Sequence, residues 1–125
     1  MPLRILIVEN HPDSRQLMGY LLESFGYQVQ LAANGEEGIE RALHEDFDLI
    51  LCDVRMPGTD GYEVARRLRA DPLRCKTPLV AVTALTWHGN HDHLLTAGFD
   101  GYVSKAIAPQ HFVQQIQDFL SNWQK

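Results

Sequence analysis

The 125-residue chain has no long apolar run, and this absence limits where it is expected to work. The apolar run Ile5 to Val8 is followed at once by Glu9, so it is too short for a secretory signal. Nowhere does the chain approach the ~18 consecutive apolar residues of a membrane span. The only two cysteines, Cys52 and Cys75, are too few for a disulfide framework. We therefore expect a cytoplasmic protein without membrane attachment.

Positive charge is also scarce, because 11 basic residues stand against 16 acidic ones and the formal net charge is −5. Nonspecific binding to nucleic acid depends on Lys and Arg neutralising phosphates, so direct nucleic-acid binding is not expected. One basic stretch is predicted to be the solvated face and end of a helix: Arg66, Arg67, Arg69, Arg74 and Lys76. The length and the mixed composition predict one globular domain over residues 1–125.

Five short apolar, β-prone runs alternate with segments of helical periodicity. The runs are Arg4–Val8, Gln28–Ala32, Asp48–Asp53, Leu79–Thr83 and Gly101–Ser104. They lack a clean alternation of apolar and polar residues, which is typical of strands covered on both faces in a parallel sheet. Strands alternating with helices in this way predict an α/β domain with right-handed crossovers.

Local signals place the helices between these runs. Four residues at the spacing i, i+3, i+4 and i+7 mark the first segment as an amphipathic helix: Met18, Leu21, Leu22 and Phe25. Pro12 suits the first turn of this helix and Gly26 its C′ position. Asn34-Gly35 predicts a turn before the second helix, and Asp60 predicts an N-cap for the third. The fourth helix is expected to begin near His91 and the last at Pro109.

Polar residues follow four of the predicted strands. They are Glu9-Asn10-His11 after the first strand, Asp53 at the end of the third, Thr83 at the end of the fourth and Lys105 after the fifth. The carboxyl ends of parallel strands meet at one edge of a sheet, so these side chains are expected to share a pocket. Two carboxylates suit Mg²⁺, and Asp53 suits a nucleophile that accepts a phosphoryl group.

The stretch DLILCDVRMPGTDGYE resembles the phosphoacceptor strand and loop of response-regulator receiver domains. Its P-x-x-D-G pattern is formed by Pro57, Asp60 and Gly61. Thr83 follows Asp53 by thirty residues and Lys105 follows Thr83 by twenty-two, and both intervals are typical of that family. Tyr102, three residues before Lys105, is similar to the family's switch aromatic. The resemblance covers essentially the whole chain.

This resemblance implies a (βα)5 flavodoxin-like sandwich with strand order 2-1-3-4-5 and helices on both faces. It implies that Asp53 takes a phosphoryl group from a histidine kinase or histidine phosphotransfer protein, and that Thr83 and Lys105 contact that group. The Mg²⁺ ligands implied are Glu9, Asn10, Asp53 and the main-chain carbonyl of Arg55. Thr83 and Tyr102 would switch the face formed by the fourth helix, fifth strand and fifth helix, which binds a downstream protein effector. The chain is then a signalling switch and not an enzyme.

Two positions depart from the family pattern. Asn10 stands where the family usually has a second acid, which predicts weaker Mg²⁺ binding by about 1–3 kcal/mol but less repulsion among carboxylates without the metal. Ala106 stands where proline usually follows the lysine, and a trans Lys105–Ala106 bond is expected because a cis bond there is costly. These departures keep open an atypical receiver that acts as an interaction module with weak or no phosphorylation.

Two other classes share parts of this pattern. A phosphatase of the haloacid dehalogenase type would need an acid two residues after Asp53, where this chain has Arg55. A flavodoxin-like carrier would need a hydroxyl- and glycine-rich loop after the first strand, and neither G-x-x-x-x-G-K-[ST] nor G-x-G-x-x-G occurs. Histidines lie near the acidic site and the fourth helix: His11, His88, His91 and His93. A transition-metal site is kept as an alternative for them, but their spacing matches no strong metal-binding motif, and solvated histidines are expected.

Overall fold

Strands and helices alternate along the chain, and the computed structural model describes them over residues 2–83, 89–104 and 108–123. The elements are β1 (Arg4–Val8), α1 (Pro12–Ser24), β2 (Gln28–Ala32), α2 (Gly35–His44), β3 (Leu49–Asp53), α3 (Gly61–Ala70), β4 (Leu79–Thr83), α4 (Gly89–Ala97), β5 (Gly101–Ser104) and α5 (Pro109–Trp123). All strand pairs are parallel, in the order β2-β1-β3-β4-β5. The predicted doubly wound α/β architecture is therefore confirmed.

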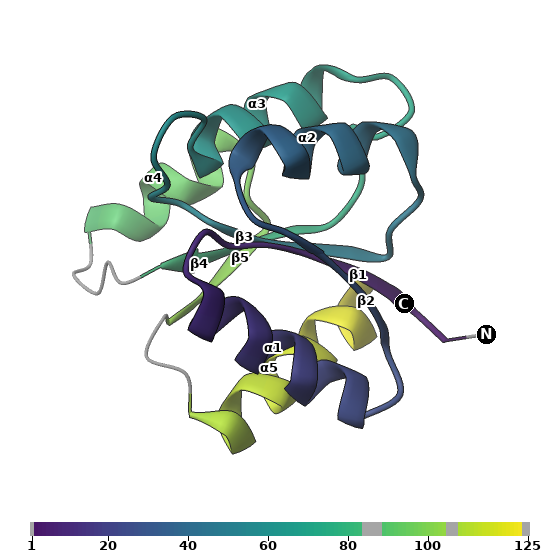
Figure 1. Cartoon of the computed structure of the whole chain (residues 1–125). Helices are drawn as coiled ribbons and strands as arrows, with labels where there is room; N and C mark the ends of the chain where they lie inside the picture. The colour runs from purple at the N-terminus through teal and green to yellow at the C-terminus, as the bar shows by residue number, and fades with distance from the viewer. Residues whose placement is uncertain (1, 84–88, 105–107, 124–125) are drawn as a thin grey trace.

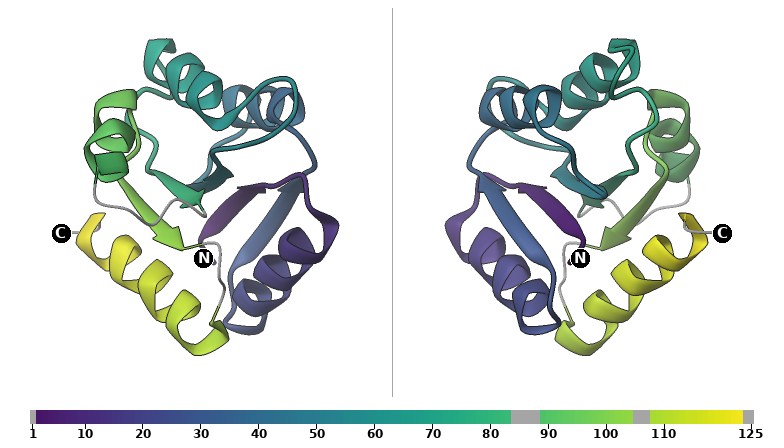
Figure 2. Two further views of the ribbon diagram at one scale, coloured as in Figure 1. Left: turned by 90° about the vertical axis from the view of Figure 1, so that its left-hand side faces the viewer. Right: turned by 90° about the vertical axis from the view of Figure 1, so that its right-hand side faces the viewer.

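The helices form two layers around the sheet. α2, α3 and α4 cover one face, whereas α1 and α5 cover the other (Figure 1), and views along the sheet show the same two layers (Figure 2). Every residue of β3 and β4 is buried, which explains why these segments read as continuous apolar runs. Within the described ranges, no helix has the length and apolar character needed to cross a lipid bilayer.

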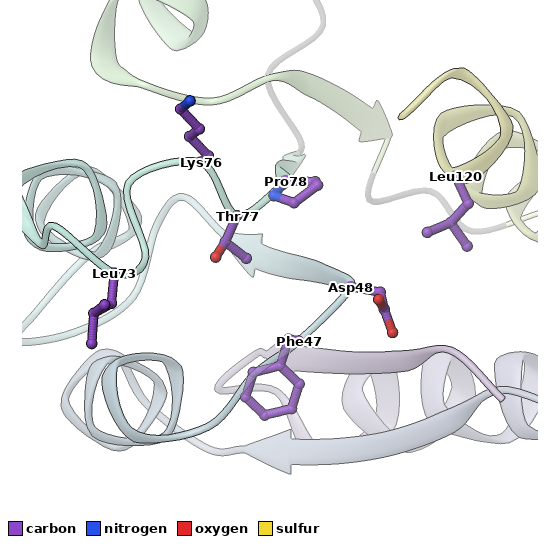
Figure 3. Close-up of a pocket in the computed structure, with 7 residues that line it drawn as sticks. All are labelled: Phe47, Asp48, Leu73, Lys76, Thr77, Pro78 and Leu120. Atoms are coloured by element: carbon purple, nitrogen blue, oxygen red, sulfur yellow. The ribbon is translucent and has the colours of Figure 1, made fainter. Parts of the chain in front are cut away.

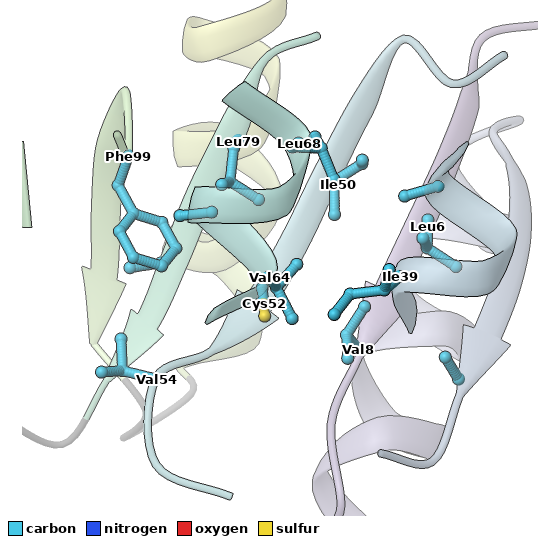
Figure 4. Close-up of a cluster of buried hydrophobic side chains, with 14 of the residues drawn as sticks. Leu6, Val8, Ile39, Ile50, Cys52, Val54, Val64, Leu68, Leu79 and Phe99 are labelled. Atoms are coloured by element: carbon cyan, nitrogen blue, oxygen red, sulfur yellow. The ribbon is translucent and has the colours of Figure 1, made fainter. Parts of the chain in front are cut away.

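Each face of the sheet has its own apolar core. The core under α2, α3 and α4 includes Leu6, Val8, Ile39, Ile50, Cys52, Val54, Val64, Leu68, Leu79 and Phe99 (Figure 4). The core under α1 and α5 includes Ile5, Ile7, Met18, Leu22, Leu49, Leu51, Phe112 and Ile116. Successive residues of β3 thus enter opposite cores, as the two-residue period of a strand requires.

α1 buries only part of its predicted apolar stripe. Met18 and Leu22 are fully buried and Leu21 is half-buried, but Phe25 lies beyond the helix and is 60% exposed. Gly26, with a φ of +92°, turns the chain into β2 in a left-handed conformation that favours glycine. The predicted amphipathic helix and its end at Gly26 are therefore confirmed, although Phe25 at the cap lies mostly in solvent.

Side-chain caps begin α2 and α3. The side chain of Asn34 accepts a hydrogen bond from the main-chain nitrogen of Glu37 at 2.8 Å, so Asn34 caps α2 and Gly35 is its first residue. The change of direction predicted at this pair thus occurs at Asn34, between β2 and the first residue of α2. Asp60 accepts from the main-chain nitrogen of Glu63 at 3.1 Å, which confirms the predicted cap of α3. Caps of this kind contribute about 1 kcal/mol each.

The basic stretch is only partly a solvated face. Arg66 is exposed and pairs with Glu63 one turn earlier, where its hydrogen bond and charge lower the pKa of the Glu63 carboxyl. Arg74, in contrast, has a side chain only 16% exposed and forms an ion pair with Asp46. The prediction of a uniformly solvated stretch is therefore wrong, because ion pairs within the fold hold several of its members.

Arg69 connects three segments through its guanidinium group. It donates to the main-chain oxygens of Gly98 (2.9 Å), Cys75 (3.0 Å) and Thr77 (2.8 Å). It also pairs with the carboxylate of Asp100 at 2.8 Å, and its side chain is only 24% exposed. Arg69 thus ties α3 to the loop before β4 and to the loop before β5.

The two thiols should differ sharply in reactivity. Cys52 is fully buried in the core, and burial together with the neighbouring Asp53 charge raises the pKa of its thiol. Cys75 is half-buried in the loop between α3 and β4. In the native protein at pH 8 we expect a disulfide reagent to modify Cys75 rapidly and Cys52 only after unfolding, as followed by mass spectrometry. Equal rates at the two thiols, or reaction of a Cys75→Ser variant without denaturant, would contradict the burial of Cys52.

Candidate functional site

Three buried polar side chains lie at the carboxyl edge of the sheet. Glu9 follows β1 directly, Asp53 ends β3 and Thr83 ends β4, and these residues are 0%, 2% and 2% exposed. The β3–β4 register pairs Asp53 with Val82, one residue before Thr83. In the described part of the chain, no other polar or charged residue is classed as buried. Buried charged groups are usually paired, coordinate a metal ion or take part in a reaction. The carboxyl edge of the sheet, which carries Glu9 and Asp53, is therefore the candidate functional site.

The loop after β3 is held closely against that strand. The main-chain nitrogen of Gly61 donates to the oxygen of Val54 at 3.0 Å, and a Cβ on Gly61 would lie 2.6 Å from the main-chain oxygen of Asp53. Glycine is therefore required for this close approach. The main-chain nitrogen of Arg55 donates to Oδ1 of Asp53 at 3.2 Å, which orients the carboxylate.

The main chain and the first helix fix the position of Glu9. Its main-chain nitrogen donates to the oxygen of Ala32 at 3.0 Å, and its own oxygen accepts from the guanidinium of Arg15 at 2.9 Å. Oε2 of Glu9 accepts from the main-chain nitrogen of His11 at 3.2 Å. The carboxylate is thus held at the strand end, on the strand next to Asp53.

Asn10 interacts with both carboxylates. With its amide oriented to satisfy its neighbours, the nitrogen donates to Oδ2 of Asp53 at 3.3 Å and to Oε2 of Glu9 at 3.2 Å. The amide therefore offsets part of the repulsion between two adjacent negative charges. To offer its oxygen to a cation, Asn10 would have to rotate and give up both of these hydrogen bonds.

His11 also lies within this cluster. Its Nδ1 is 3.4 Å from Oε2 of Glu9, and one ligand atom from each of Glu9, His11 and Asp53 falls within 4.8 Å of the others. The His11 side chain is 61% exposed, so its ring has access to solvent. The sequence places His11 beside the acidic site, with a transition-metal site as the less favoured alternative, and no spacing rule indicates how closely the ring approaches Glu9.

A hollow of about 590 Å³ opens beside the cluster. Its lining consists of Asn10, His11, Val54, Arg55, Met56, Pro57, Asp60 and Tyr62. A volume of this size is typical of sites that admit a small molecule or a side chain of a partner. The hollow thus lies beside Asn10 and His11, the two residues that contact the buried carboxylates.

Not every predicted site residue can be placed. Lys105 and Ala106 lie outside the described residues, so the contact of Lys105 with a phosphoryl group and the trans peptide bond stay predictions. Tyr102 lies on β5 and is 39% exposed. Its ring borders a hollow of about 210 Å³ between β5 and α5.

Another hollow, of about 410 Å³, lies at the opposite edge of the sheet (Figure 3). It is lined by Phe47, Asp48, Leu73, Lys76, Thr77, Pro78 and Leu120. The side chains of Asp48 and Lys76 do not converge there (Figure 3). This hollow lies at the amino ends of β3 and β4, away from the edge where ligands of open α/β sheets bind.

Comparison with known proteins agrees with this geometry. The chain matches the family model of the response regulator receiver domain over residues 5–117, and it belongs to that family. It is therefore a receiver domain of two-component signalling, a class of signalling switches. It is 32% identical to the polar-differentiation response regulator DivK of Brucella anthropi over 122 residues, which cover 98% of this chain and 99% of DivK.

Other relatives are larger proteins. The chain is 36% identical to the transcriptional regulatory protein ResD of Bacillus subtilis over 94% of its own length, but it spans only 48% of ResD. It likewise spans 12% of the histidine-protein kinase BarA of Escherichia coli, to which it is 36% identical. Receiver sequences of this kind thus occur both alone and within longer chains.

Solved structures share the fold. The chemotaxis protein CheY4 of Vibrio cholerae matches with a TM-score of 0.88 at 27% identity, over 94% of this chain and 98% of CheY4. The receiver domain of the sensor histidine kinase PA1611 of Pseudomonas aeruginosa matches with a TM-score of 0.87 at 30% identity, over 97% and 99% of the two chains. That structure has a magnesium ion coordinated in its active-site cleft.

Proposed function

We propose that this domain, residues 1–125, is a phosphoacceptor receiver that takes a phosphoryl group from a phosphohistidine onto Asp53 and works in the cytoplasm. The observation that carries the proposal is the burial of Glu9 and Asp53 on adjacent strand ends beside an open hollow. The donor is a histidine kinase or a histidine phosphotransfer protein. We expect no direct contact with nucleic acid or membrane.

The residues of the site have separate proposed roles in phosphoryl transfer. A carboxylate oxygen of Asp53 attacks phosphorus while the bond to the donor's histidine nitrogen breaks, so the phosphoryl group moves and the donor histidine is regenerated. The main-chain nitrogen of Arg55 orients the carboxylate of Asp53 at 3.2 Å. The Thr83 hydroxyl and the Lys105 ammonium are the proposed contacts of the phosphoryl oxygens.

The donor set fits a divalent cation, because two adjacent buried carboxylates supply hard oxygen ligands and negative charge. Glu9, Asp53, the main-chain carbonyl of Arg55 and, after rotation of its amide, Asn10 would hold Mg²⁺. The ion would neutralise charge on the transferred group.

The readout is proposed to pass through Thr83 and Tyr102. Thr83 ends β4 and is paired with Ser104 of the neighbouring strand β5, which also carries Tyr102. Movement of the hydroxyl toward the phosphoryl group would let the half-exposed Tyr102 ring turn inward and change the α4–β5–α5 face. A downstream protein effector would read this change.

Acetyl phosphate tests the proposal directly. Incubation of the native protein with acetyl phosphate and Mg²⁺ should add one phosphoryl group to the intact mass, and chelation of Mg²⁺ should prevent the addition. Asp53→Asn should abolish it because an amide is a poor nucleophile. The matched control is Asp60→Asn, since asparagine also caps a helix and this residue is an acid in the same loop.

The second candidate function is an interaction module with weak or no phosphorylation. The position of the Asn10 amide between Glu9 and Asp53 favours it, because that amide satisfies both carboxylates without a metal. If the native protein gains no mass at any Mg²⁺ concentration, the phosphoacceptor proposal fails and this second function is supported.

A further inference from the structure

The imidazole of His11 adds a nitrogen donor to a site otherwise made of oxygen donors. Its Nδ1 lies 3.4 Å from Oε2 of Glu9, and the ligand atoms of Glu9, His11 and Asp53 lie within 4.8 Å of one another. Two ligands bound at about 2.1 Å to one transition metal are roughly 3–4 Å apart. Small rotations of these side chains would therefore bring all three atoms to a common cation.

The chemistry of the cluster disfavours Mg²⁺ relative to transition metals. Mg²⁺ depends on charged oxygen ligands, and Asn10 supplies a neutral amide whose nitrogen faces the carboxylates. Imidazole nitrogen, by contrast, suits Zn²⁺, Ni²⁺ and related cations. Asn10 thus lacks the negative charge that Mg²⁺ favours, and His11 supplies a nitrogen that transition metals favour. Both residues therefore shift the metal preference of the site from Mg²⁺ towards transition metals.

We propose that Glu9, His11 and Asp53 form a mixed nitrogen and oxygen site that takes a first-row transition cation of the Co²⁺ and Zn²⁺ class in preference to Mg²⁺. This proposal deepens the metal site of the proposed function and assigns His11 as a ligand. His11 precedes α1 without a side-chain capping hydrogen bond, so its replacement does not remove a helix cap.

The test measures how much the preference for Co²⁺ over Mg²⁺ depends on the imidazole ring of His11. Dissociation constants of Co²⁺ and Mg²⁺ are determined by calorimetry for the native protein and for His11→Ala. Many sites bind Co²⁺ more tightly than Mg²⁺, so the informative quantity is the ratio of the two affinities. We expect His11→Ala to lower this ratio by about 10-fold or more, the typical effect of disrupting a metal's ligand shell.

A matched control separates this site from surface histidines. His44 is 68% exposed and lies 3.6 Å from Glu40, so it offers a histidine–glutamate pair without a second carboxylate. His44→Ala should leave the ratio within about twofold of the native value. In nuclear magnetic resonance spectra, one equivalent of Zn²⁺ should shift the ring nitrogens of His11 before those of any other histidine.

Two results would overturn the proposal: an unchanged ratio in His11→Ala, or Zn²⁺ saturating another histidine first. Failure of the proposed function is seen separately, as a lack of phosphoryl uptake by the native protein from acetyl phosphate. That outcome does not alter the His11→Ala ratio, so the two proposals can fail independently.

Discussion

Asn10→Asp is expected to tighten Mg²⁺ binding by roughly 10–100-fold and to lower the stability of the metal-free protein. With its amide oriented to donate, the nitrogen of Asn10 lies 3.2 Å from a Glu9 oxygen and 3.3 Å from an Asp53 oxygen. A carboxylate there replaces two hydrogen bonds with repulsion from two like charges. The same negative charge attracts a divalent cation, so the two effects have one cause.

The two effects are measured on the same pair of proteins. Calorimetric titration gives the Mg²⁺ dissociation constants, and urea unfolding in the presence of chelator gives the metal-free stability. We expect the variant to be less stable by about 1–3 kcal/mol without metal and to recover stability as Mg²⁺ is added. Asn10→Ala is the control, since it removes the hydrogen bonds without adding charge. Mg²⁺ binding by Asn10→Asp no tighter than by the native protein would show that Asn10 does not limit the metal site.

Arg69→Met is expected to destabilise the fold by about 2–4 kcal/mol. The substitution keeps an apolar stem but removes the donors to Gly98, Cys75 and Thr77 and the partner of Asp100. Oδ2 of Asp100 also accepts a hydrogen bond from the main-chain nitrogen of Leu79, the first residue of β4. Without its arginine partner, Asp100 should hold the start of β4 less firmly. Urea unfolding followed by circular dichroism measures the free energy of unfolding.

Arg66→Met is the matched control because it makes the same change on the same helix. Arg66 is 66% exposed and contacts only Glu63 among the hydrogen bonds found in the described residues. Exposed ion pairs contribute little, so this variant should unfold close to the native midpoint. Equal unfolding midpoints for the two variants would show that the carbonyls bonded to Arg69 find other donors.

The fold could be predicted from the sequence because its strongest signals are local. The apolar runs of β3 and β4 and the cap at Asp60 depend on neighbours in the chain, and the structure confirms them. The end of α1 is also a local signal, because Gly26 at the predicted C′ position takes a left-handed conformation directly after the cap Phe25. Arg69 was mispredicted because two of its partners, Gly98 and Asp100, lie 29 and 31 residues away, where composition gives no signal.

The candidate site could likewise be predicted only where its signals follow from the order of residues along the chain. The positions of Glu9, Asp53 and Thr83 follow from one rule, that parallel strands end at one edge. The sequence also singled out Asn10, but it could not show that the amide nitrogen faces both carboxylates, which depends on distances across two strands. The proximity of the His11 ring to the acidic pair depends on a side-chain rotamer, and no spacing rule contains that information.

The position of Asp53 on β3 has a consequence for hydrogen exchange. β3 lies between β1 and β4 and is buried at all five residues, whereas β2 at the sheet edge is mostly exposed or half-buried. Main-chain amides of β3 should exchange only when the whole domain unfolds, while those of β2 exchange through local opening. Any ligand at Asp53 therefore acts on one of the two fully buried strands. Its binding should slow deuterium uptake in β3 by nearly the full binding free energy.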